Sequence, residues 1–424
     1  MVVTMSASNL LRHLAATLLL ASALASPNLM AEEDAFDALD RLLDENFEEI
    51  DRTLEEQFQL LDRAMEDAYQ RLSEEIRAEW GEDEVELPSK KEWVDYSDDM
   101  KTRRKIDFEA GVVKLERLID LGDAADAIIR DMQNASNSLK TDTLADLAQK
   151  DQAVEYARES LTEDGIDLSS PPNTAAPLPV LNGMDQSIPD SARIGAMVSQ
   201  ALTATAQSNT VQPANNTATV IPLGNNKAKV VVAIPLARNY QQQLTDRYEA
   251  AVIAEAKKQK IPPSLLFAVM ETESSFNPRA TSAVPAYGLM QLVPRSGAMD
   301  AYNFVYGVKT LLDPEYLYQP GNNVELGSAY LNLLLSRYLR AVEDPLSRKY
   351  CAIAAYNTGA GNVARAFTGK RNVGEAAKLI NRMKPDEVFN HLRTNLPYDE
   401  TRHYIEKVTK AQKKYTSFDD THLI

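Results

Sequence analysis

The segment that decides the fold runs from Ile261 to Pro278 and reads IPPSLLFAVMETESSFNP. Two prolines precede an apolar run, which is typical of the start of a buried helix. A helix that begins near the prolines carries Glu273 at its C-terminal end. Three, four and seven residues earlier come Met270, Val269 and Leu266, on the same helical face. The segment therefore predicts a carboxyl group walled in by apolar side chains.

Such a carboxyl group loses solvation of its charged form, so we expect the pKa of Glu273 to rise and its proton to be retained near neutral pH. A protonated carboxyl group can act as a general acid. Glu271 is a competitor, because it lies about 200° around the helix and also has apolar neighbours, Phe267 and Ala268. The helical periodicity does not choose between the two glutamates. A solvated or capping residue at the helix end is the simpler alternative for either.

Two further motifs follow in the chain. Gly288-Leu-Met-Gln291 predicts a close approach of the backbone, followed by an apolar and an amide contact. Met290 can equally be an ordinary filler of the core. The next motif, at the end of a predicted apolar helix, is Ala355-Tyr-Asn-Thr-Gly-Ala-Gly361. It places a phenol, Tyr356, and an amide, Asn357, at the helix end, and its glycines allow the chain to turn sharply away from the helix.

The last motif is Pro397-Tyr-Asp-Glu-Thr-Arg-His-Tyr404. Here Glu400 and Tyr404 are four residues apart, so they share one face of a predicted helix. The same spacing is found in solvated pairs on helix surfaces, and this alternative stays open.

With these four motifs in order, the chain resembles the lytic murein transglycosylases that have a goose-lysozyme-like catalytic domain. The resemblance implies cleavage of the MurNAc-GlcNAc β-1,4 bond of peptidoglycan, with Glu273, directly before the serine, as general acid and then base. It also implies that the 6-hydroxyl of the muramic acid attacks and leaves a 1,6-anhydro end, so that no second carboxylate is needed. The residues that the resemblance places at the substrate are Ser274, Met290, Gln291, Tyr356, Asn357, Glu400 and Tyr404.

Two other functions compete with this one. A goose-type lysozyme would hydrolyse the same bond with water, and a non-catalytic scaffold would use the cleft only to bind peptidoglycan. The charge of residues 236–424 fits all three, because 24 basic and 19 acidic side chains make this part mildly positive, which suits a polymer whose peptide stems carry carboxylates.

The first 25 residues have the pattern of a signal peptide, with Arg12 before an apolar stretch and the small-residue site Ala23-Leu-Ala25. Cleavage after Ala31 is an alternative. Membrane-bound lytic transglycosylases usually carry a lipid on a cysteine just after the signal, but the single cysteine here is Cys351. We therefore expect a periplasmic protein without a lipid anchor, with peripheral contact to the outer membrane left open.

Other ligands are not expected. The mature chain's histidines, His391, His403 and His422, form no ligand cluster in the sequence. We therefore predict no metal site, no cofactor and no nucleic-acid partner.

An 11-residue repeat occupies residues 36–80, where Phe36, Phe47, Phe58, Tyr69 and Trp80 recur in step. This period is close to that of a straight helix and predicts one long amphipathic helix or a hendecad coiled coil. Residues 32–86 hold 22 acidic and five basic side chains, and an anionic face is repelled by anionic lipid. We expect self-association or a protein partner, the alternative being a helix that packs on its own protein.

The remaining segments complete the predicted organisation. Residues 32–100 form the acidic helix, and 103–236 a small α+β domain with a hairpin around Ala110-Gly111, a flexible linker at 165–226 and a late strand at 229–236. This domain resembles the non-catalytic domain of a membrane-bound subgroup of the same family. Residues 240–420 form the α-helical, lysozyme-like catalytic domain. The fold class is mostly α.

Overall fold

The computed structural model describes residues 32–120, 122–166, 187–207 and 218–420, and the side chains among them except those of 32–51 and 205–207. The predicted signal peptide and most of the predicted linker lie outside these residues. The chain divides at Glu56 into two units. The first contributes the beginning of helix α2 (Glu32–Trp80), and the second holds all the rest.

Helix α2 is buried along one side from its middle onward. Leu61, Met65 and Ala68 pack against helix α5 (Gln152–Glu163) and against residues of the helical domain. Leu72, Ile76 and Trp80 pack on the sheet. Over this part of the 11-residue repeat the helix therefore packs on its own protein, which was the alternative to self-association. Side chains of the earlier repeats lie outside the described ones.

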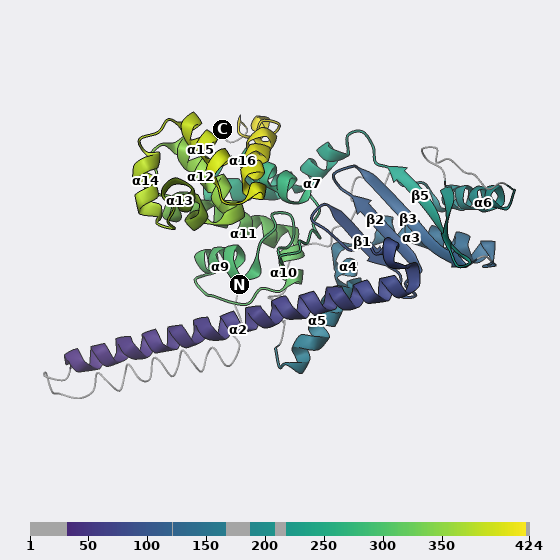
Figure 1. Ribbon diagram of the computed structural model, residues 1–424, viewed down its shortest axis with the longest axis horizontal. Coiled ribbons are helices and arrows are strands. Elements are labelled where there is room, and N and C mark those ends of the chain that lie inside the picture. Colours follow the sequence, from purple (N-terminus) through teal and green to yellow (C-terminus); the bar gives the residue numbers. More distant parts are fainter. Residues whose placement is uncertain (1–31, 121, 167–186, 208–217, 421–424) are drawn as a thin grey trace. The chain divides into compact units, whose positions relative to one another are not determined.

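The α+β domain contains one antiparallel sheet in the order β1-β2-β3-β5-β4 (Figure 1). Its strands are β1 (Glu92–Tyr96), β2 (Thr102–Asp107), β3 (Val112–Asp120), β4 (Ala218–Gly224) and β5 (Lys227–Pro235). The predicted hairpin is confirmed, with Asp107 opposite Val112 around Gly111. Two expectations are corrected. The acidic helix was predicted to extend over 32–100, but α2 ends at Trp80 and β1 follows within that range. Strand β4 lies inside the predicted linker at 165–226.

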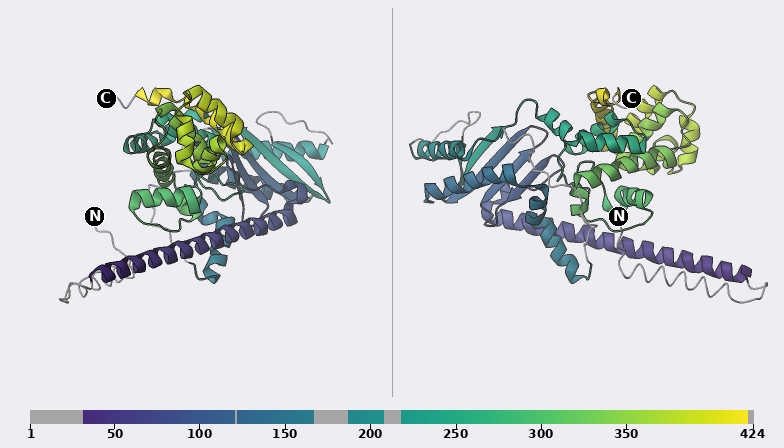
Figure 2. Two further views of the ribbon diagram at one scale, coloured as in Figure 1. Left: turned by 60° about the vertical axis from the view of Figure 1, so that its left-hand side comes forward. Right: turned by 180° about the vertical axis from the view of Figure 1, so that it is seen from behind.

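Helices cover both faces of this sheet (Figures 1 and 2). Val113 and Leu115 face α3 (Ala125–Thr141) and α6 (Ser191–Gln207), while Leu118 faces α2. Arg103 is fully buried on the α2 side, where its guanidinium pairs with Glu116 and lies 4.5 Å from the Trp80 ring. Successive side chains of a strand point to opposite faces of the sheet, so each face has its own buried residues beneath a covering helix. The short helix α4 (Leu144–Lys150) precedes α5.

The region from residue 240 is helical, as predicted. Its helices are α7 (Tyr240–Gln259), α8 (Pro263–Ser274), α9 (Met299–Tyr306), α10 (Pro314–Tyr318), α11 (Pro320–Leu333), α12 (Pro345–Thr358), α13 (Ala360–Thr368), α14 (Val373–Ile380), α15 (Pro385–Asn395) and α16 (Asp399–Gln412). A single turn of π-helix at 294–298 directly precedes α9, and another at 334–338 directly follows α11. Every residue of α8 from Pro263 to Met270 is buried. The predicted apolar helix is thus the centre of this domain.

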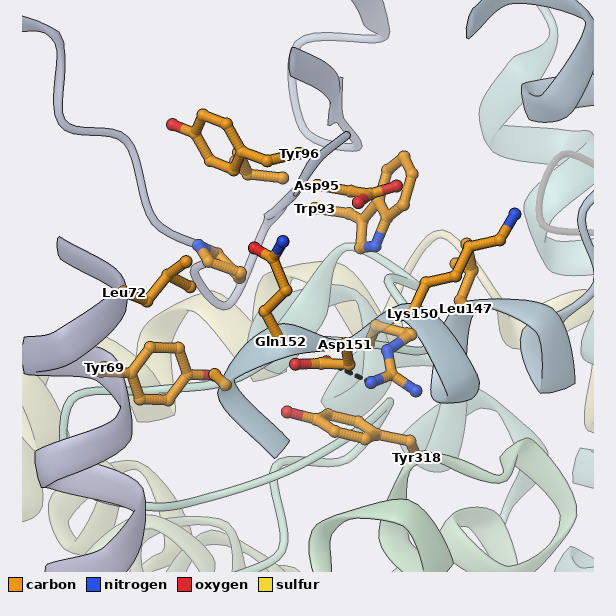
Figure 3. Close-up of a pocket in the computed structure, with 14 residues that line it drawn as sticks. Tyr69, Leu72, Trp93, Asp95, Tyr96, Leu147, Lys150, Asp151, Gln152 and Tyr318 are labelled. Atoms are coloured by element: carbon orange, nitrogen blue, oxygen red, sulfur yellow. Dashed lines mark hydrogen bonds and ion pairs between the residues drawn. The ribbon is translucent and has the colours of Figure 1, made fainter. Parts of the chain in front are cut away.

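A buried arginine connects the two domains at a small cavity, of which Figure 3 labels the lining residues Tyr69, Asp151 and Tyr318. Arg279, which is 4% exposed, pairs with Asp151 at the start of α5 and, at 2.9 Å, with Glu315 of α10. Its guanidinium also lies 4.2 Å from the ring centre of Tyr318. Tyr69 of α2 lines the same cavity. The α+β domain, α2 and the segment that follows α8 therefore meet at one charge cluster.

Substitution of Arg279 tests the weight of this cluster. Arg279→Met should lower the free energy of unfolding by about 3 kcal/mol, the lower end for a broken buried ion pair, because two partly buried carboxylates lose their counterion. The surface pair of Arg393 and Glu406 supplies the matched control, and Arg393→Gln should change stability by less than about 1 kcal/mol. Urea titration of both variants measures the difference. Equal losses would contradict the structural role of the buried cluster.

Candidate active site

Glu273 lies in the last turn of α8, where the helix ends abruptly. Pro263 occupies the first turn, and the backbone turns left-handed at Ser275 and Phe276, with φ values of 50° and 66°. Two consecutive left-handed residues without glycine are strained. This exit leaves the Glu273 side chain 5% exposed, at the wall of a groove.

Ser274 does not line that groove. Its hydroxyl donates to the carbonyls of Met270 and Leu289, at 3.0 and 2.8 Å, and accepts from the Phe276 N–H at 3.1 Å. The side chain is completely buried. The predicted contact of Ser274 with substrate is therefore corrected: the serine ties the end of α8 to the next loop, with one hydrogen shared between two carbonyls, and its complete burial keeps it away from the groove.

The segment Gly288–Gln291 forms a tight turn against α11. Gly288 has a φ of 77°, and an added Cβ would lie 2.4 Å from the Leu317 carbonyl and 2.3 Å from Asn323. The buried Asn323 amide accepts from the Met290 N–H and donates to the carbonyls of Tyr287 and Leu317. The predicted close approach of the backbone is therefore confirmed.

Met290 and Gln291 differ within this turn. Met290 is fully buried and packs against Gly327, so its side chain is core, which corrects the prediction of a sugar contact. Gln291 has a φ of 50° and lines the groove. Its Nε2 donates to the carbonyls of Ala280 and Gly288, whereas its Oε1 has no hydrogen-bond partner among the described residues.

The end of α12 forms another side of the groove. Tyr356 and Asn357 both line it, as the sequence predicted. The Tyr356 hydroxyl donates to the Met290 carbonyl at 2.8 Å, and Asn357 Oδ1 accepts from the Thr401 hydroxyl at 2.6 Å. These bonds link α12 to the Gly288–Gln291 turn and to α16.

Helix α16 completes the surroundings of Glu273. Glu400 lines the groove, and the buried Tyr404 lies beside the Glu273 carboxyl group without a hydrogen bond of good geometry. Burial, with the nearby Glu273 charge, holds the pKa of Tyr404 well above its ordinary value. The two side chains differ in their surroundings: Tyr404 is buried beside Glu273, whereas Glu400, whose side chain is 68% exposed, lies at the solvent-facing rim of the groove.

Lys90 was not predicted, and it comes from the segment between α2 and β1. It lines the groove, and its Nζ lies 3.3 Å from Glu400 Oε1. Its carbonyl accepts from the Asn277 amide at 3.4 Å, and the Ser89 carbonyl accepts from the Thr281 N–H at 3.4 Å. A lysine 183 positions before Glu273 gives no signal in the sequence, because only the packing of two domains brings it there.

The environment of Glu273 supports the expected protonation. Burial raises the pKa of Glu273 from its ordinary value to about 7. The positive charge of Lys90 and the Tyr404 hydroxyl lower the pKa, while the negative charge of Glu400 raises it. Burial prevails because the apolar end of α8 removes water from the charged form. Near neutral pH the group is thus poised between acid and base.

Glu271 is placed differently. Its carboxylate accepts from Lys414 and, at 2.6 Å, from the Tyr415 hydroxyl. It lines a separate hollow and not the groove that contains Glu273. The tertiary structure therefore distinguishes the two glutamates as candidates for the general acid, which helical periodicity could not do.

The groove has a volume of about 860 Å³. Its walls combine amide, hydroxyl and aromatic side chains, including a Tyr398 ring that is 52% exposed. Besides the predicted residues, it is lined by Lys90, Arg295, Tyr330, Asn362, Tyr398 and Thr401. Aromatic rings beside polar groups suit the faces and hydroxyls of a sugar chain.

Comparison with known proteins agrees with this geometry. The transglycosylase SLT domain family matches residues 250–379, and the family of the N-terminal domain of membrane-bound lytic murein transglycosylase C matches residues 56–167. A membrane-bound lytic murein transglycosylase C from Actinobacillus succinogenes is 32% identical over 351 residues, which cover 81% of this chain and 86% of that protein. The chain belongs to this family. It is therefore a lytic murein transglycosylase, a lyase that cleaves peptidoglycan.

Other relatives agree. A lytic murein transglycosylase C from Klebsiella pneumoniae strain 342 is 32% identical and covers 79% of this chain and 85% of its own length. Among solved structures, a lytic transglycosylase Slt from Pseudomonas aeruginosa is 29% identical over 40% of this chain and 24% of that one, with a TM-score of 0.31. This score is too low to compare the overall folds.

The relatives from Actinobacillus succinogenes and Klebsiella pneumoniae are named as membrane-bound proteins. None of the helices within the described residues is both long enough and apolar enough to cross a bilayer.

The Gly288 turn of this lytic transglycosylase offers a test of the groove floor. Gly288→Ala should lower the free energy of unfolding by well over the 1–2 kcal/mol that a left-handed alanine costs, because its Cβ also collides with the Leu317 carbonyl. Gly307→Ala is the control, since Gly307 has a similar φ of 73° in open space. Thermal and urea unfolding measure both variants. A loss for Gly288→Ala no larger than the control's would contradict the close approach.

Proposed function

We propose that the chain cleaves the MurNAc-GlcNAc β-1,4 bond with Glu273 as its general acid and then its general base, and that the product carries a 1,6-anhydro-muramic acid end. The observation that carries the proposal is the buried Glu273 carboxyl group, with a pKa of about 7, at the wall of the large groove. A group with this pKa can give up a proton in one step and take one in the next.

The proposed reaction has two steps. Glu273 first protonates the glycosidic oxygen while the bond from that oxygen to C1 of the muramic acid breaks, and GlcNAc leaves as the alcohol. The 6-hydroxyl of the same muramic acid then attacks C1 as its proton passes to the Glu273 carboxylate. The acid is regenerated and no water is consumed. An internal hydroxyl in the correct geometry replaces a positioned water.

Glu400 determines how this reaction differs from hydrolysis. It is the other carboxylate near Glu273, and a second carboxylate could serve as the base for a water molecule, as in a goose-type lysozyme. In the structure its carboxylate is paired with Lys90. With Lys90 beside it, this carboxylate is engaged at the rim of the groove, which favours the internal hydroxyl as nucleophile.

We propose sugar contacts for those predicted residues that face the groove. Gln291 borders the groove, although its unpaired amide oxygen is buried, while Asn357 offers its amide and Tyr356 its aromatic ring. Glu400 and Tyr404 would orient Glu273 from α16. Ser274 and Met290 would act through the backbone that they hold in place.

Location and partners are proposed from the sequence. A chain with a signal-like start that acts on murein would work in the periplasm. Self-association or a protein partner would use the repeat before Phe58, because Phe58 and the later repeat positions are buried in the protein itself.

Substitution of the two glutamates tests the function. Glu273→Gln should reduce lysis of purified murein by at least about 1,000-fold, because the amide cannot donate an acidic proton. Glu271→Gln should retain most activity and serves as the control. Mass spectrometry of the wild-type products should show anhydro ends without incorporation of oxygen from ¹⁸O-water. Reducing muramic ends would identify a lysozyme, and unchanged lysis by Glu273→Gln would refute the assignment of the acid.

The charges of Lys90 and Glu400 have opposite effects on the pKa of Glu273, so their removal should shift the pH dependence of activity in opposite directions. The acid must be protonated, so kcat/KM should fall as pH rises through about 7. Lys90→Gln removes a charge that lowers the Glu273 pKa and should move this fall to higher pH, whereas Glu400→Gln should move it to lower pH, each by up to about one unit. The pH dependence of turbidity loss measures both. Shifts in the same direction would contradict this electrostatic account.

A further inference from the structure

A second hollow, of about 310 Å³, lies next to the groove. Four lysines line it: Lys91, Lys407, Lys410 and Lys414. Its apolar walls include Phe108 of the α+β domain and Phe276 after α8. No part of the proposed reaction uses this hollow.

The positive charge of the hollow is only half compensated. Lys91 pairs with Glu109, and Lys414 pairs with Glu271. Lys407 and Lys410 have no carboxylate partner within the described part of the chain. With four lysines and two glutamates among its lining residues, the hollow keeps an excess of two positive charges.

Folding accounts for only part of this excess, because Lys410 lies in the last turn of α16, where a positive charge is favourable, whereas Lys407 lies before that turn. Lys407 and Lys410 are three residues apart on one face of α16, and Lys414 follows just after the end of this helix. Like charges at this spacing repel one another and weaken a helix slightly. An anion that lies between them would remove the repulsion, and the apolar walls would strengthen its attraction by excluding water.

The hollow and the groove share the same three elements. Thr272 of α8 lines the hollow beside Glu273, and Lys91 lines it beside Lys90 of the groove. On α16, Glu400 borders the groove and Lys407 the hollow, seven residues or about 10 Å farther along the helix. A peptide of four extended residues spans about 13 Å. A stem attached to a sugar in the groove is therefore long enough to reach the hollow.

We propose that this lysine-lined hollow binds the carboxylates of a murein peptide stem while the glycan lies in the groove. The inference rests on the proposed function, because that function places the glycan. Lysine ammonium groups are point charges that accept a carboxylate in several orientations. The Phe108 and Phe276 walls suit the aliphatic parts of a peptide between its charges.

The experiment compares two substrates with one double variant. Lys407→Gln/Lys410→Gln should lower kcat/KM roughly tenfold on murein with intact stems. On the same glycan after an amidase has removed the stems, the variant should equal the wild type. Lys370→Gln/Lys413→Gln, which changes two exposed lysines that do not line the hollow, is the matched control.

A binding measurement keeps the proposal independent of catalysis. The free murein tetrapeptide should bind the full chain in calorimetry, more weakly at higher salt, and at least fivefold more weakly to the double variant. Equal activity on both substrates with unchanged peptide binding would overturn the proposal. Loss of binding to vesicles of anionic phosphatidylglycerol, with no change for the peptide, would assign the lysines to a lipid surface and overturn it as well. A wild-type chain that binds the peptide but cleaves neither substrate would refute the proposed function alone.

Discussion

The paired charge of Arg279 is the constraint on which much of the structure depends. A guanidinium with so little access to water is tolerable only while Asp151 and Glu315 both stay in place. These two carboxylates come from different domains, and Arg279 itself is six residues after Glu273. The same segment contains Asn277, whose amide contacts the backbone around Lys90. Docking of the domains and the path of the chain after α8 are therefore set together.

This arrangement makes the α+β domain a part of the active site. Burial alone would make Glu273 a weak acid that rarely ionises, and the Lys90 charge from outside the helical domain moderates this effect. Glu400 faces both groups and has the opposite influence. The proton affinity of the carboxyl group is thus a balance among an apolar helix, a lysine from one domain and a glutamate from another element. The repeat in α2 contributes indirectly, because its second half packs against both domains.

The sequence was most informative where local pattern and tertiary environment agree. The apolar run before Glu273, the hairpin at Gly111 and the close approach at Gly288 all follow from residue types within a few positions, and the structure confirms each. Other features were out of reach for physical reasons. Strand β4 follows a polar, proline-rich segment, and only pairing with β5 makes it a strand. Ser274 and Met290 belong to conspicuous motifs, yet a motif does not say whether a side chain faces the groove or the protein core behind it. Contacts between distant segments, such as that of Lys90 with Glu400, depend on docking and leave no periodic trace.

Gln291 shows what a constrained side chain implies for recognition. Both hydrogens of its amide point to fixed carbonyls, so the group cannot rotate to offer an N–H to the groove. The oxygen alone remains, and an oxygen can only receive. That oxygen is covered by other protein atoms, so the polar end of Gln291 holds the wall of the groove in place and presents no free group to its surface. Its two donors fix the carbonyls of Ala280 and Gly288, and the left-handed backbone of Gln291 keeps this arrangement in one orientation.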